Sequence, residues 1–140
     1  EELHQLLPIF TRRECPVEIE VCDVKFIKYY INAYNDLLNM ISSGNKNNLQ
    51  MILQDCDFII QFCPSRKSDA LTIKGLAYYH AGETLEAKQY LTKAAELDET
   101  NSIARVYLKN IYFKLGKINE AEKLLVQIKK YSPDALPYLE

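Results

Sequence analysis

The stretch GLAYYHAGETLEA, residues 75–87, decides the fold of this chain. Before Gly82, apolar residues recur at helical spacing over residues 70–81, and after it they do so again over residues 84–97. A glycine between two such patterns indicates a tight turn. The stretch therefore predicts two helices joined as a helix–turn–helix unit.

The same unit recurs further along the chain. Residues 103–115 and 119–131 show a second pair of helical patterns, with Gly116 in the turn, 34 residues after Gly82. A fixed period of helix–turn–helix units indicates a repeat architecture, because one unit cannot bury its apolar stripe alone. Three further pairs have the same separation: Tyr78 and Tyr112, Ala87 and Ala121, Leu91 and Leu125.

A looser helix pair precedes these units. One apolar stripe runs from Ile27 to Ile41, with Asp23 as the expected N-cap, and a second runs from Leu49 to Cys63 before Pro64 stops it. We expect the two helices to form an antiparallel hairpin.

These residues resemble the tetratricopeptide repeat (TPR) family. In 68–101, Gly75 and Tyr78 match the small and aromatic positions of the first helix, and Glu99 replaces the usual closing proline. The packing positions of the second helix are Ala87, Leu91 and Ala94. In 102–135 Lys109 takes the small position, whereas five residues fit the pattern: Leu108, Tyr112, Ala121, Leu125 and Pro133.

The resemblance implies an all-α fold, a TPR-like right-handed superhelix of about three helix–turn–helix units with an irregular N-terminal arm. We expect the domain to span 23–140, with units at about 23–67, 68–101 and 102–135. Residues 1–22 would be an arm, extended or a short helix, or the end of a preceding domain. The last apolar residues would cover the final unit or meet a partner: Leu136, Tyr138 and Leu139.

Composition excludes several functions. Apolar residues make up 48% and charged residues 26% of the 140, and the net charge of −2 does not indicate a nucleic-acid surface. No apolar run approaches the roughly 20 residues that span a membrane. The sequence has no phosphate-binding glycine loop, HExxH or GxSxG. We therefore expect no enzyme activity, cofactor or metal. The chain begins at Glu1, so we expect a piece of a longer protein, and a cytoplasmic location is favoured.

The four cysteines do not form a zinc motif. Cys56 and Cys63 are seven residues apart in a helical pattern, about 10 Å along the axis, which is too far for a disulfide. We interpret both as small buried apolar residues. Cys15 could pair with Cys22 or with another thiol.

In TPR stacks the first helix of each unit lines a concave groove. The resemblance places six candidate partner-binding residues there: Leu76, Tyr79, His80, Asn110, Phe113 and Lys114. Such a surface suits an extended or helical peptide. It lacks the cations of the two-carboxylate clamp found in chaperone-binding TPR domains. Alternatively, Tyr79 and Phe113 are core residues or are covered by a cap, and His80 is an ordinary last-turn helix residue.

The layout also resembles, more weakly, the C-terminal region of ToxR/CadC/HilA-like bacterial transcription regulators. The order is an apolar segment, LHQLLPIF, then CDVKFIKYYINAYNDLL, then TPR units. This gives a second hypothesis, a regulatory or sensor region that acts through a homodimer or a small ligand. The first hypothesis is a non-catalytic domain that binds a partner protein or peptide in its groove.

Overall fold

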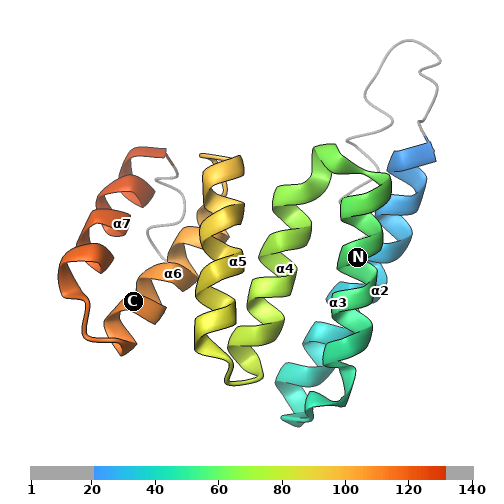
Figure 1. Ribbon diagram of the computed structural model, residues 1–140, viewed down its shortest axis with the longest axis horizontal. Coiled ribbons are helices and arrows are strands. Elements are labelled where there is room, and N and C mark those ends of the chain that lie inside the picture. Colours follow the sequence, from blue (N-terminus) through green and yellow to red (C-terminus); the bar gives the residue numbers. More distant parts are fainter. Residues whose placement is uncertain (1–20, 132–140) are drawn as a thin grey trace.

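The computed structural model describes residues 21–131, and side chains from residue 24 onward. This part of the chain is all-α and contains no strand. Figure 1 shows the helices standing side by side in chain order, in the arrangement of a TPR-like helical repeat. The α-helices are α2 (Val21–Ser43), α3 (Leu49–Phe62), α4 (Lys67–His80), α5 (Thr84–Leu97), α6 (Ser102–Lys114) and α7 (Ile118–Tyr131); two short 3-10 turns are η1 (Lys46–Asn48) and η2 (Pro64–Arg66).

The glycine turns confirm the predicted hairpins. Gly82 and Gly116 have φ angles of 86° and 76°, a left-handed conformation that side chains disfavour. Their hydrogen bonds repeat as well: the Glu83 amide donates to the Tyr78 carbonyl at 2.9 Å, and the Lys117 amide donates to that of Tyr112 at 2.8 Å. The two turns are therefore equivalent, as the 34-residue period predicts.

The expected start of the first helix was wrong. Helix α2 begins at Val21, so Asp23 lies inside the helix and is not its N-cap. An acidic residue is also favourable in the first turn, because the helix dipole is positive there. The end of the next helix was predicted correctly, since α3 stops at Phe62 and Pro64 begins η2. The predicted arm at residues 1–20 and the tail after residue 131 lie outside the described residues.

The helices form two layers that enclose the core. In one layer α4 contacts both α2 and α6, whereas α3, α5 and α7 form the other layer. One buried cluster lies among α2, α3 and α4, around Met40, Ile52 and Ile59. A second lies among α4, α5 and α6, around Leu91, Leu108 and Ile111. Each cluster takes residues from more than one helix pair, so neighbouring units share their core.

Gly75 marks the closest approach of α4 and α5, as its small position predicts. A Cβ atom built there would lie 2.5 Å from the Leu91 Cγ. Lys109, 34 residues later, is 5% exposed, and burial lowers the pKa of its ammonium group. Helices α6 and α7 pack less extensively than α4 and α5. The long side chain at the small position gives a physical reason for this looser last pair.

Asn101 joins the second and third helix pairs. Its Oδ1 accepts from the Ala104 amide at 3.1 Å and caps α6. Its Nδ2 donates to the hydroxyls of Ser68 and Thr72 on α4, at 2.9 and 2.7 Å. One side chain therefore caps a helix and ties it to the preceding unit.

We expect Asn101→Ala to lower the free energy of unfolding by about 2 kcal/mol, because it removes a cap and two hydrogen bonds between units. Asn101→Ser keeps a capping oxygen but cannot replace the amide donors, so it should lose about half as much. Urea unfolding followed by circular dichroism measures both. Asn101→Ser as stable as the unmodified chain would contradict the role of the bonds to α4.

The cysteines required one correction. Cys56 is fully buried and free, and burial raises the pKa of its thiol, so it is not poised to react. Cys63 is also fully buried but is disulfide-bonded, and its partner lies outside the described side chains. The prediction that Cys56 and Cys63 do not bridge each other is confirmed, whereas Cys63 as a simple apolar residue was wrong.

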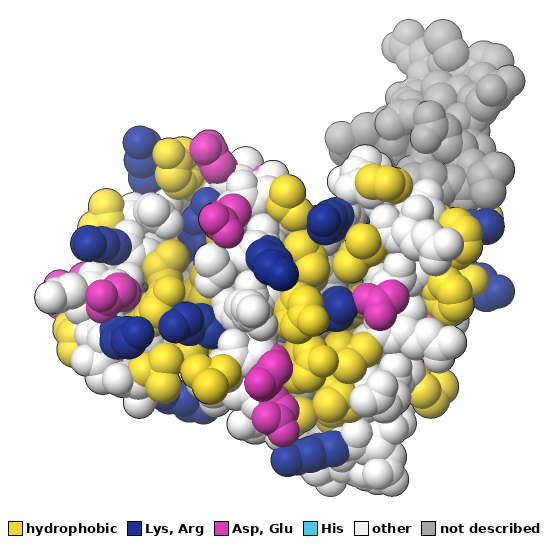
Figure 2. Space-filling model, in the orientation of Figure 1, with side chains coloured by type: hydrophobic (Ala, Val, Ile, Leu, Met, Phe, Trp, Pro, Cys, Tyr) yellow, Lys and Arg dark blue, Asp and Glu magenta, His cyan; other side chains and the backbone are white. Residues whose placement is uncertain are grey.

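The described surface is mixed in charge. On the face shown in Figure 2, basic and acidic side chains are interspersed among apolar ones. No helix in residues 21–131 combines the length and apolar character needed to cross a membrane. Within the same residues no group of three or more His, Cys, Asp and Glu side chains gathers as a metal site would.

Candidate functional site

Three aromatic rings and one cation meet between α4 and α6. The Tyr79 ring lies edge-on to the rings of His80 and Tyr107, with centroids 5.2 and 5.3 Å apart. The His80 and Tyr107 rings are 6.1 Å apart, also edge-on. Lys114 Nζ lies 4.6 Å from the centroid of the Tyr79 ring. We call these four residues the Tyr79–Tyr107 cluster.

The repeat places these side chains together. His80 and Lys114 are 34 residues apart, so they occupy the same position in successive units. Tyr107 precedes Lys114 by seven residues, which is two helical turns, so both lie on one side of α6. Since α4 and α6 belong to one layer and contact each other, the two sides face a common surface.

The cluster carries one positive charge near neutral pH. Burial first, and then the charge of Lys114, lower the pKa of His80 below its ordinary 6.5. Burial and the neighbouring Tyr79 raise the pKa of the Tyr107 hydroxyl. The imidazole and the phenol are therefore neutral at pH 7, and Lys114 supplies the charge. Edge-on rings beside a cation suit an apolar or aromatic side chain with a nearby carboxylate.

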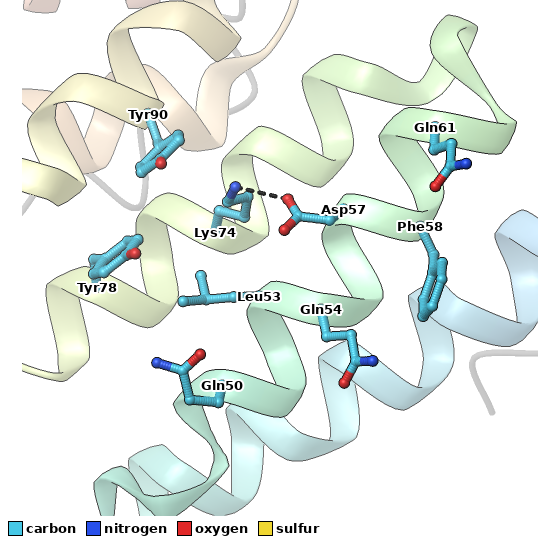
Figure 3. Close-up of a pocket in the computed structure, with 9 residues that line it drawn as sticks. All are labelled: Gln50, Leu53, Gln54, Asp57, Phe58, Gln61, Lys74, Tyr78 and Tyr90. Atoms are coloured by element: carbon cyan, nitrogen blue, oxygen red, sulfur yellow. Dashed lines mark hydrogen bonds and ion pairs between the residues drawn. The ribbon is translucent and has the colours of Figure 1, made fainter.

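A pocket of about 480 Å³ lies elsewhere, among α3, α4 and α5 (Figure 3). At its centre Lys74 Nζ donates to Asp57 Oδ1 at 2.8 Å and lies 4.5 Å from the centroid of the Tyr90 ring. The Tyr78 and Tyr90 rings stack nearly parallel, 3° apart in plane and 5.5 Å between centroids. Its lining residues are Gln50, Leu53, Gln54, Asp57, Phe58, Gln61, Lys74, Tyr78 and Tyr90.

Neither arrangement supplies catalytic chemistry. No carboxylate contributes to the pKa shift of His80, whose charged neighbour is the Lys114 cation, and a general base needs a positioned partner. Lys74 is held charged in its ion pair: burial lowers the pKa of Lys74, but the hydrogen bond and charge of Asp57 outweigh this and raise it.

Comparison with known proteins finds one family match, over part of the chain. Residues 78–139 match the family model described as tetratricopeptide repeat. These residues belong to the tetratricopeptide repeat family. No curated protein matches the chain significantly. The TPR match spans α5, α6 and α7, and it includes the turn after Tyr78 and every buried residue of the second cluster except Leu71.

The structure brings together three of the six residues expected in the TPR groove. Tyr79, His80 and Lys114 belong to the cluster. Leu76 packs against the core cluster among α2, α3 and α4 instead. Asn110 is half-buried, and no described contact joins it to the cluster. Phe113 is 44% exposed, so it is not a core residue, whereas its cover by a C-terminal cap stays a prediction because that segment lies outside the described residues.

Sequence reasoning missed Tyr107. It is half-buried, packs against the second core cluster and contacts both Tyr79 and His80. The 34-residue period could not have revealed it, because the matching residue in the preceding unit is Ile73, a core residue. The available signal was its spacing of seven residues from Lys114, which places both residues on the same side of one helix.

Proposed function

We propose that this chain is a non-catalytic interaction domain and that the Tyr79–Tyr107 cluster binds a peptide segment of a partner protein. TPR repeats generally mediate protein–protein interactions. The proposed domain keeps the expected limits, 23–140, with three helix pairs as its units.

The observation that carries the proposal is the edge-on packing of Tyr79 against Tyr107 beneath a cation. Tyrosines held by their neighbours lose little freedom on binding, and such residues often dominate the energy of interfaces. Here the core beneath α4 and α6 supports both rings, while part of each stays exposed. Lys114 adds one positive charge beside them. The best-suited partner segment presents an apolar or aromatic side chain and a carboxylate.

Capture experiments with matched variants test this. The intact chain is immobilised, bound proteins are identified, and the affinity of the main partner is measured for Tyr107→Ala and Tyr112→Ala. Both tyrosines lie half-buried on α6, but Tyr112 has Lys88 over its ring and is outside the cluster. We expect Tyr107→Ala to weaken binding about 30-fold, the effect of a hot-spot residue of about 2 kcal/mol.

The control variant decides between a site and a general loss of structure. Tyr112→Ala should bind within about threefold of the unmodified chain, well under 1 kcal/mol. Equal losses in the two variants, or no loss in either, would contradict binding at the cluster. Helical circular dichroism verifies that each variant is folded.

The hypothesis of a transcription-regulator region stays a prediction, as does the homodimer. Neither the family match nor a described contact bears on them. A winged-helix domain encoded upstream of Glu1 would support the regulator hypothesis.

A further inference from the structure

The pocket lies where the outer helices separate. Helix α4 contacts both α3 and α5 extensively, whereas α3 and α5 barely contact each other. Helix α4 therefore forms the floor of the gap between α3 and α5, and its residues Lys74 and Tyr78 line the pocket. The Tyr79–Tyr107 cluster, by contrast, lies between α4 and α6.

We propose that this pocket is a second binding site, which takes an extended, uncharged stretch of a partner protein and recognises it through its backbone. The proposal does not depend on binding at the Tyr79–Tyr107 cluster. It rests on the charge of the pocket, on the groups along its edge and on its walls.

The charge of the pocket is balanced. Lys74 and Asp57 form an ion pair at 2.8 Å, and the Lys74 side chain is 11% exposed. An anionic ligand would compete with Asp57 for Lys74, and a cationic ligand would compete with Lys74 for the carboxylate of Asp57. The Asp57 side chain is 62% exposed, so breaking the pair chiefly leaves the more enclosed Lys74 without its partner. Outside the lining, Lys93 Nζ lies 5.6 Å from the centroid of the Tyr90 ring. A neutral ligand fits best.

Three glutamines follow the α3 edge of the pocket: Gln50, Gln54 and Gln61. A primary amide both donates and accepts hydrogen bonds, as the peptide backbone does. Among residues 24–131 none of these three side chains has a hydrogen-bond partner, so their donors and acceptors can serve a ligand. Figure 3 shows Gln54 and Gln61 along α3 and Gln50 at its beginning.

The spacing of these amides matches an extended chain. Four helical residues from Gln50 to Gln54 rise about 6 Å, close to the roughly 6.6 Å between alternate residues of an extended peptide. From Gln50 to Gln61 the rise is about 16 Å, which about five extended residues cover. A volume of about 480 Å³ lies within the range of pockets that hold a ligand or short segment.

The walls offer flat apolar contacts beside these amides. The stacked rings of Tyr78 and Tyr90 stand on the α4 and α5 side, and Leu53 and Phe58 come from α3. Aromatic rings contact side chains of a bound strand without requiring a particular one. The pocket is thus suited to backbone recognition with modest side-chain selectivity.

A peptide library tests the proposal. Random heptapeptides displayed on phage are selected on the intact chain, and enriched sequences are synthesised with capped ends. Calorimetry then measures their affinity for the unmodified chain, for Gln50→Ala/Gln54→Ala, for Tyr107→Ala and for Gln89→Ala. Gln89 is an exposed glutamine on α5 outside the pocket and serves as the matched control.

We expect the enriched peptides to be uncharged. They should bind the Gln50→Ala/Gln54→Ala variant at least about tenfold more weakly than the unmodified chain, because two hydrogen bonds are lost. The same peptides should bind the Tyr107→Ala and Gln89→Ala variants with the affinity that they have for the unmodified chain. N-methylation of alternate backbone amides in the peptides should weaken their binding to the unmodified chain by at least the same factor of about ten. The proposal is overturned if no enriched peptide depends on the two glutamines, if the dependent peptides are charged, or if N-methylated peptides bind equally well. Loss in Tyr107→Ala alone would support the first site and reject this one.

Discussion

Gly75→Leu is expected to lower the free energy of unfolding by about 3 kcal/mol, near the upper end for overpacking a tight core. A Cβ atom at residue 75 would lie 2.5 Å from the Cγ and 2.7 Å from the Cδ2 of Leu91. It would also lie 3.3 Å from the Leu91 backbone nitrogen. Rotation of the leucine cannot relieve the backbone contact, so α4 and α5 would have to separate.

Urea unfolding followed by circular dichroism measures this loss. Gln89→Leu introduces the same side chain at an exposed position of α5 and should change stability by no more than about 0.5 kcal/mol. If Gly75→Leu were as stable as Gln89→Leu, the close approach of α4 and α5 would be refuted.

Leu91→Ala is expected to cost about 3 kcal/mol by leaving a cavity in the second core cluster. Leu91 is fully buried, and its neighbours in that cluster include Leu108 and Ile111 on α6. These belong to the next unit, so one truncation weakens the packing within its own unit and the packing between units.

Leu85 provides the matched control for this truncation. It is on the same helix but 68% exposed, so Leu85→Ala should change the free energy of unfolding by no more than about 0.5 kcal/mol. Similar losses in Leu91→Ala and Leu85→Ala would show that the cluster does not hold the units together. In the double variant Gly75→Leu/Leu91→Ala, the loss in the free energy of unfolding should be smaller than the sum of the two single losses. The leucine at residue 75 partly fills the cavity left by Leu91→Ala, and that truncation removes the side chain with which the new leucine would clash.

The sequence predicted what depends on local signals. Gly82 and Gly116 fix the turns because only glycine tolerates their conformation easily, and Pro64 ends α3 because it cannot continue a helix. Gly75 reveals the close helix crossing, since a larger residue would collide with Leu91. Each of these residues acts through its own backbone or its nearest neighbour.

The rest depends on how the helices approach in space. The resemblance to TPR placed Tyr79 on a groove-facing side of α4 but could not show that Tyr107 would meet it. It matched Tyr78 to the aromatic position of the repeat, and Tyr78 does pack on the core, but it did not show the stacking of Tyr78 on Tyr90 in a pocket wall. That pocket exists because α3 and α5 separate above α4, and no single helix pattern contains this information.

The central claim, that a partner segment binds at the Tyr79–Tyr107 cluster, is tested most directly by nuclear magnetic resonance. The chain is labelled with ¹³C in its tyrosine rings and titrated with the captured partner segment. We predict that the signals of Tyr79 and Tyr107 shift with increasing partner, while those of Tyr78, Tyr90 and Tyr112 stay in place. Shifts confined to Tyr78 and Tyr90, or no tyrosine shift at saturation, would contradict the claim.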